Sequence, residues 1–237
     1  MGDNRHGEQA ERIYSGIMAT EIIFSDISAV LTPQTADLMK LISPDWQRKL
    51  ANFRFDIDRK LSLYAELVVR QRACEQLGLA NQDVTFSKNE YGKPYLRDYP
   101  GFRFNISHTR NAIAVAFSNS DIGADIEHVK TPDIKIAERF FTLQEMELIV
   151  KSKNPDQAFY EIWTAKEAYI KFQGEGLSIP LNSFNVLDEA ISSLIHTFLA
   201  NEYIISVCGN ETNAENDVLT VITEDELLIR LTGRKHV

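Results

Sequence analysis

The sequence of 237 residues is poor in cysteine and has neither a long apolar run nor a basic excess. Cys74 and Cys208 are too few and too far apart for a disulfide framework or a zinc site, so we interpret them as buried free thiols of a cytoplasmic protein. No run of 18 apolar residues occurs, which argues against a membrane span. The polar stretch MGDNRHGEQAER lacks the apolar core of a secretory signal, and we expect residues 1–12 to be a disordered lead-in.

The charge balance argues against nucleic acid as a partner. The formal net charge is −9, whereas a nucleic-acid binder would present a basic face. An acidic balance by itself indicates no more than a well-solvated surface. One local exception is the segment 46–60, WQRKLANFRFDIDRK, which gathers five of the basic residues.

The pattern of apolar residues predicts an α+β protein of two similar lobes. Alternating or apolar runs predict strands at 21–28, 84–96 (strand, turn, strand), 102–109, 112–118, 121–129, 177–187, 195–209 and 218–223. Helical spacing predicts helices at 32–53 (broken at Ser43–Pro44), 58–79 (ending at Gly78), 141–152 (with a capping box from Thr142 to Glu145) and 158–174. No short-period repeat and no low-complexity segment is present.

Strands and helices therefore follow the same order twice, with a polar seam, SNSD, at 118–121. We expect an N-terminal lobe at 13–119 and a C-terminal lobe at 120–237, with the active site in the cleft between them.

The motif GADIE (123–127) is the first candidate for chemistry. On a strand Asp125 and Glu127 share one face, while Ala124 and Ile126 face the other way. A divalent cation would relieve the repulsion between the two carboxylates. Gly123 would let another backbone or a ligand approach closely. The alternative is a half-exposed strand whose acids are simply solvated.

The helix WTAKEAYIK (163–171) is the second candidate. Trp163, Glu167 and Lys171 share one helical face, and Lys166 lies one step round, beside apolar residues. A solvated Glu–Lys pair would explain the charges, but this helix is apolar around much of its circumference, so we expect some of its charges to line a cavity. Three carboxylates, Asp125, Glu127 and Glu167, would suit Mg²⁺, and Mn²⁺ cannot be distinguished from it by oxygen ligands alone.

Basic groups elsewhere in the sequence indicate a phosphate ligand near such a site. Lys93 follows a glycine turn in YGKPYL, and Ser107 and His108 end the strand FNISHT. A lysine supplies a point charge to phosphate, and a histidine beside phosphate can donate a charge-assisted hydrogen bond.

The series YGKPYL, FNISHT, IGADIE, FFTLQE and WTAKEAYIKFQGEGLSIPLNSF resembles the 4′-phosphopantetheinyl transferases, in particular the large, monomeric, surfactin-synthetase-type subclass. The similarity runs from about Ile13 to about Leu228. The G-x-D-x-E and W-x-x-K-E-x-x-x-K motifs are specific when they occur together. This resemblance implies a monomer of two pseudo-symmetric α+β lobes that transfers phosphopantetheine from coenzyme A to a serine of an apo acyl or peptidyl carrier protein, releasing adenosine 3′,5′-bisphosphate.

The resemblance also implies site residues. Asp125, Glu127 and Glu167 would be the metal ligands, and Glu167 also the base. The residues expected at catalysis or at the coenzyme phosphates are Lys166, Lys171, His108, Ser107, Lys93, Pro94 and Asp125, and those expected at the adenosine 3′-phosphate are Lys49, Lys60 and Ser62. Trp46 departs from the family pattern, because relatives can carry a basic residue there.

Two further expectations concern partners. The segment 139–149 is a candidate carrier-docking surface through Phe140, Phe141 and Met146, although these could equally be core residues of an amphipathic helix. The alternatives to a transferase are a non-catalytic relative that binds coenzyme A or a carrier protein, and a Mg²⁺-dependent phosphohydrolase.

Overall fold

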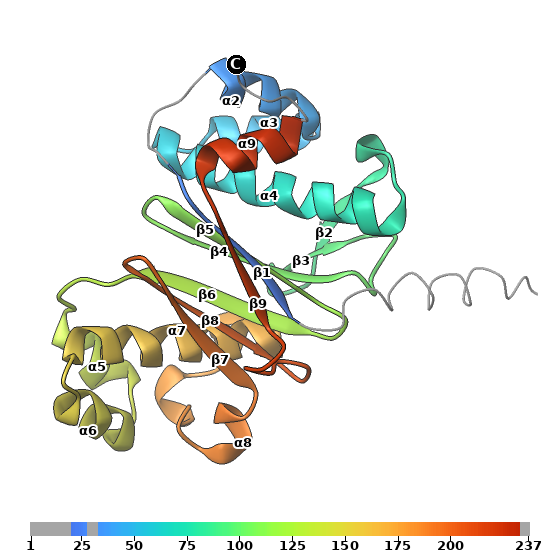
Figure 1. Ribbon diagram of the computed structural model, residues 1–237. Helices are drawn as coiled ribbons and strands as arrows, with labels where there is room; N and C mark the ends of the chain where they lie inside the picture. Colours follow the sequence, from blue (N-terminus) through green and yellow to red (C-terminus); the bar gives the residue numbers. More distant parts are fainter. Residues whose placement is uncertain (1–19, 28–32, 233–237) are drawn as a thin grey trace, which may run out of the picture.

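The computed structural model describes residues 20–27 and 33–232. The predicted lead-in at 1–12 and the predicted start of structure near Ile13 lie outside these residues. Within them the chain forms an α+β fold of two lobes, and Figure 1 shows two sheets stacked between outer helices. No helix in these residues is both long and apolar enough to cross a membrane.

The first lobe is built on a four-stranded sheet in the order β4–β5–β1–β9. Its strands are β4 (Arg103–Thr109), β5 (Ala112–Ser118), β1 (Glu21–Asp26) and β9 (Val218–Ile222). The helices that cover its outer face are α2 (Pro33–Leu38), α3 (Pro44–Ala51), the long α4 (Asp56–Leu77) and α9 (Glu224–Thr232). A short hairpin of β2 (Phe86–Lys88) and β3 (Pro94–Leu96) flanks β4.

The second lobe pairs a three-stranded antiparallel sheet with one long helix. The strand order is β6 (Ile122–His128), β8 (Tyr203–Gly209) and β7 (Ile195–Ala200), and the helix is α7 (Pro155–Gln173). The shorter helices α5 (Ile134–Phe140), α6 (Leu143–Lys151) and α8 (Glu189–Ser192) lie on the outer side of this lobe. The predicted capping box of α6 is confirmed, because Thr142 and Glu145 exchange side-chain and backbone hydrogen bonds.

An apolar layer between the two sheets joins the lobes. Ile22 and Phe24 of β1 meet Ala124 and Ile126 of β6 in one buried cluster. The prediction that Ala124 and Ile126 point away from Asp125 and Glu127 is therefore confirmed. Separate clusters lie between each sheet and its helices, so the fold has four layers, helix–sheet–sheet–helix.

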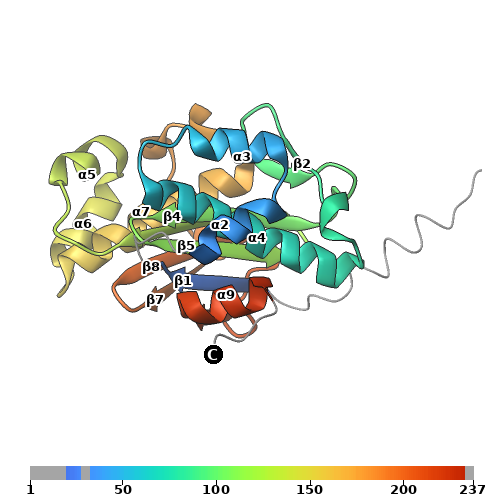
Figure 2. The same cartoon turned by 90° about the horizontal axis from the view of Figure 1, so that it is seen from above.

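Two predictions about the second half of the chain are wrong. The segment 177–187 forms two 3-10 turns, Gly176–Ser178 and Leu181–Ser183, and not a strand. The last strand and helix belong to the first lobe, because β9 pairs in parallel with β1 and α9 packs beside α2 and α4 (Figure 2). The expected C-terminal lobe of 120–237 therefore does not include β9 and α9. The strand β9 forms an edge of the first sheet instead.

Candidate active site

The face of β6 that packs against α7, opposite the apolar layer between the sheets, carries the acidic motif. Gly123 permits this contact, since a Cβ atom there would lie 2.0 Å from the carbonyl oxygen of Ala168 and 2.3 Å from the nitrogen of Phe172. Asp125 and Glu127 follow on the same face of β6, so α7 packs against the strand beside these two carboxylates. The predicted close approach at Gly123 is thus an approach of backbone to backbone.

Lys171 connects the last turn of α7 to Asp125. Its Nζ atom donates to Asp125 Oδ1 at 2.7 Å, to Ser107 Oγ at 3.0 Å and to the Ala124 carbonyl at 3.1 Å. Ser107 in turn donates to the same Asp125 Oδ1 at 2.8 Å. The structure therefore brings together three predicted residues from β4, β6 and α7.

Alternate residues of β4 extend this contact along β6. Asn105 Oδ1 accepts from the Ala124 nitrogen at 2.9 Å, and Thr109 Oγ1 donates to Glu127 Oε2 at 2.9 Å. With Ser107 they form a polar row spaced by two residues, as one face of a strand requires. Asn105 and Thr109 were not expected at the site, although their period of two with Ser107 was visible in the sequence.

The three predicted metal ligands affect each other electrostatically. The pKa of Glu167 is raised, chiefly by burial and then by the charge of Asp125. The pKa of Glu127 is raised by the same two causes in the same order. The strand motif and the helix motif thus lie within electrostatic range of one another.

The donor set suits a hard cation. Asp125 is buried, and its Oδ2 atom has no hydrogen-bond partner among the described residues. A buried carboxylate oxygen without a partner is costly, and a divalent cation with oxygen ligands would satisfy it. Among residues 20–27 and 33–232, however, no three acidic, histidine or cysteine side chains already stand as a ligand cluster. The cation that Asp125 contacts in this structure is Lys171.

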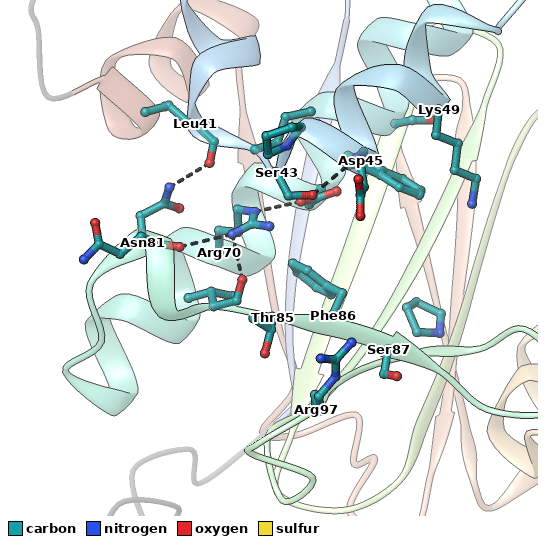
Figure 3. Close-up of a pocket in the computed structure, with 18 of the residues that line it drawn as sticks. Leu41, Ser43, Asp45, Lys49, Arg70, Asn81, Thr85, Phe86, Ser87 and Arg97 are labelled. Carbon is teal, nitrogen blue, oxygen red and sulfur yellow. Dashed lines mark hydrogen bonds and ion pairs between the residues drawn. The ribbon is translucent and has the colours of Figure 1, made fainter.

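A cavity of about 860 Å³ opens on the helix side of β4. It lies between α3, α4 and the β2–β3 hairpin (Figure 3). The predicted coenzyme-binding residues that line it are Lys49, Ser62, Pro94 and His108. Its volume is that of a typical small-molecule or cofactor site.

His108 marks where the cavity meets the acidic site. Ser107 and His108 are consecutive, so they point to opposite faces of β4, with Ser107 at Asp125 and His108 in the cavity. The pKa of His108 is lowered by partial burial and then by the positive charge of Lys171, while Asp125 opposes this. The imidazole and the Lys171–Asp125 pair are therefore electrostatic neighbours, and a ligand could reach from one to the other.

The cavity contains basic residues that sequence analysis missed. Lys88 and Arg97 of the hairpin region line it, and so does Arg70 of α4. Arg70 has a structural role, since it donates to Glu66 and to the carbonyls of Asn81 and Val84 (Figure 3). Lys88 and Arg97 lie close to the GKP turn in the sequence, but no local pattern distinguishes them from solvated surface charges.

The prediction that Lys166 contacts phosphate is wrong. Its side chain is fully buried and forms an ion pair with Glu145 of α6 at 2.8 Å. Nζ also donates to the carbonyls of Leu181 at 2.8 Å and Phe184 at 2.7 Å. Because it lies on the helix face of Ile162 and Ile170, it points away from the face of Glu167.

Two further lysines differ from expectation. Lys60 is fully buried and pairs with Glu224 of α9 at 2.5 Å, so it ties α4 to the C-terminal helix and cannot reach the 3′-phosphate. Lys93 donates to the carbonyls of Ile122 and Lys171 at 2.9 and 2.8 Å. Its ammonium group thus holds the hairpin to the second lobe and lies outside the large cavity.

The candidate docking segment divides into core and surface. Phe141 is buried, and Phe140 and Met146 pack against the same core cluster, which supports the core interpretation for all three. The exposed apolar residues of this region are instead Leu143 (84 %), Leu148 (39 %) and Val150 (74 %).

Comparison with known proteins shows the family of the chain. Residues 121–222 match the model of the 4′-phosphopantetheinyl transferase superfamily, and residues 31–120 match that of the 4′-phosphopantetheinyl transferase N-terminal domain. The chain is 35 % identical over 205 residues to 4′-phosphopantetheinyl transferase Sfp of Bacillus subtilis strain 168, covering 80 % of this chain and 91 % of the relative.

Other relatives are similarly close. A second 4′-phosphopantetheinyl transferase of Bacillus subtilis is 38 % identical over 81 % of this chain and 92 % of its own length. The 4′-phosphopantetheinyl transferase psf-1 of Bacillus pumilus is 30 % identical over 84 % of this chain and 92 % of its own length. The chain therefore belongs to the 4′-phosphopantetheinyl transferase family of enzymes.

Proposed function

We propose that this protein transfers the 4′-phosphopantetheine arm of coenzyme A to a serine of an apo carrier protein and releases adenosine 3′,5′-bisphosphate. The observation that carries this proposal is the junction at β4, where His108 lines a cavity of cofactor size and the adjacent Ser107 contacts the Lys171–Asp125 pair on the other face. A bound nucleotide in the cavity would place its pyrophosphate next to the acidic residues of β6 and α7.

Asp125, Glu127 and Glu167 are the residues that would hold Mg²⁺ or Mn²⁺. The unpartnered, buried Oδ2 of Asp125 supports this assignment. When bound, the metal would supply charge neutralisation at the pyrophosphate. Phosphoryl-type transfer depends mainly on positioning and charge neutralisation, which suits a site of few reactive side chains.

The residues of this chain then have separate tasks. Lys171, which reaches both Asp125 and Ser107, is placed to bind a phosphate oxygen and stabilise its developing charge. His108 would donate a hydrogen bond to phosphate, and the phosphate charge would favour its protonated form. Glu167 is the candidate acceptor of the proton from the carrier serine, directly or through water.

Carrier docking is proposed for the surface around Leu143 and Val150, which α6 exposes. Because the chain has a net charge of −9, recognition of an acidic partner would depend on local apolar contacts. A monomeric state and a cytoplasmic location are parts of the same proposal, and the two free cysteines are compatible with a reducing compartment.

Intact-protein mass spectrometry tests the proposed function. An apo carrier protein is incubated with the enzyme, coenzyme A and Mg²⁺, and a parallel sample contains EDTA. We expect a mass gain of one phosphopantetheine that EDTA abolishes. No gain on fatty-acid, polyketide or peptide carriers would favour a non-catalytic relative that binds coenzyme A.

A further inference from the structure

Three basic side chains line the large cavity without an acidic partner. Lys49 comes from α3, Lys88 from the end of β2, and Arg97 directly follows β3. Within residues 20–27 and 33–232, none of the three forms an ion pair. This is unusual in a chain with a net charge of −9, where carboxylates are plentiful.

The carboxylates of the cavity offset these charges only in part, through the attraction of Glu66 for Lys49. Asp45 is paired with Arg48. Glu66 is paired with Arg70 at 2.7 Å, and both side chains are largely buried. The cavity therefore carries an excess of positive charge, and Figure 3 shows Lys49 and Arg97 on different walls with Phe86 between them. Such a site favours an anion with an apolar or aromatic part.

Lys49 and Lys88 lie close enough to repel each other. The pKa of Lys49 is lowered by partial burial and then by the charge of Lys88. Lys49 Nζ also lies 4.4 Å from the centroid of the Trp46 ring, which holds it over an aromatic surface. Two ammonium groups from separate elements at one place are costly unless an anion lies between them.

Lys49 is already expected at the adenosine 3′-phosphate from the family resemblance. We propose that Lys88 is a second basic residue at this phosphate, and that it gives the enzyme its preference for coenzyme A over 3′-dephospho-coenzyme A. This inference rests on the proposed function. The proposed function assigns the pyrophosphate to His108 and Lys171, so the anionic group left for a second basic cluster is the phosphate monoester on the ribose. Lys88 of β2 thus supplies the second positive charge of a subsite in which α3 carries Trp46, at a position where relatives can carry a basic residue.

Titration calorimetry with Mg²⁺ and without carrier protein tests this assignment. Coenzyme A and 3′-dephospho-coenzyme A are each titrated into the wild type, Lys88→Met, Lys49→Met and, as a matched control, Lys153→Met, an exposed lysine of the second lobe. We expect Lys88→Met to weaken coenzyme A binding about tenfold, the usual effect of one lost charge-assisted hydrogen bond. Binding of the dephospho form should stay within about twofold of the wild type, since it lacks the phosphate.

The variants also separate this inference from the proposed function. Lys88→Met should melt no lower than the wild type, because it removes a repulsion and no contact. If Lys88→Met binds coenzyme A as the wild type does, or loses both coenzymes equally, while the wild type still modifies a carrier, the phosphate assignment alone is wrong. A wild type that binds neither coenzyme and modifies no carrier would overturn both.

Discussion

Lys171 and Asp125 meet at 2.7 Å and join the end of α7 to the middle of β6. The pair forms where Ser107 of β4 also reaches Asp125, so one carboxylate oxygen collects contacts from the first lobe and from the helix of the second. The other oxygen is buried and unpartnered within the described residues. Asp125 is therefore both the junction of the lobes and the residue best prepared to receive a cation.

Replacement of Asp125 by asparagine should remove activity while keeping the shape of the side chain. We expect the transfer rate to fall about 100-fold or more, since the charge at the proposed metal site is lost. Carrier modification followed by mass spectrometry measures this, with Glu147→Gln, a change at an exposed surface acid, as the control. A fully active Asp125→Asn enzyme would refute the metal assignment.

Gly123→Ala should displace α7 from β6. The contacts of the added Cβ are backbone atoms of Ala168 and Phe172, so no change of rotamer can relieve them. We expect a loss of about 1–3 kcal/mol in the free energy of unfolding, and a loss of activity because Glu167 and Lys171 move with the helix.

The matched control for that variant is Gly78→Ala. Gly78 ends α4 in the left-handed region with φ 67°, and nothing lies within 4 Å of an added Cβ. Its replacement should cost about 1 kcal/mol of stability without a loss of activity. Equal activity of the two variants in a carrier-modification assay would show that α7 tolerates displacement, against our account.

Lys166→Met should destabilise the protein because it leaves Glu145 charged and buried. Removal of one member of a buried ion pair costs about 3–5 kcal/mol, which urea unfolding would measure. The double variant Lys166→Met, Glu145→Gln should recover part of this loss, since it removes the buried charge. The single glutamine oxygen can still accept from one of the two backbone nitrogens, of Thr142 or Val186, that donate to separate oxygens of Glu145.

The kinetics of the same variant test its former assignment. If Lys166 held a phosphate of coenzyme A, Lys166→Met would raise KM for coenzyme A and leave stability unchanged. We expect the reverse: a clear loss of stability, and an unchanged KM under conditions where the variant is folded.

Cys208 should be unreactive in the folded protein. Burial raises the pKa of its thiol to about 12, although Lys93 opposes the shift. Iodoacetamide at pH 8 should therefore leave Cys208 unmodified in the native state and label it in urea, as peptide mass spectrometry would show. Rapid labelling of native Cys208 would mean that β8 is not buried as described.

The features that sequence predicted well are those set by local periodicity. The two-residue period of β6 placed Asp125 and Glu127 on one face and Ala124 and Ile126 on the other. The helical period of 163–171 separated Glu167 and Lys171 from Lys166, and the capping box fixed the start of α6.

The features that sequence did not predict depend on partners from distant segments. Lys166 and Lys60 were assigned to phosphates, but acids on other helices pair with them in the core. The strand β9 returns to the first sheet because β1 offers a free edge, which no local pattern reveals. Likewise, a ligand-binding role for Lys88 is indicated only by the cavity that it lines.

The most direct test of the account is to quantify adenosine 3′,5′-bisphosphate released from coenzyme A with and without an apo carrier protein. We predict release only when carrier is present, with one nucleotide for each carrier that gains phosphopantetheine. Release without carrier would indicate a phosphohydrolase and contradict the proposed transfer. Binding of coenzyme A without any release would indicate a non-catalytic protein that binds coenzyme A.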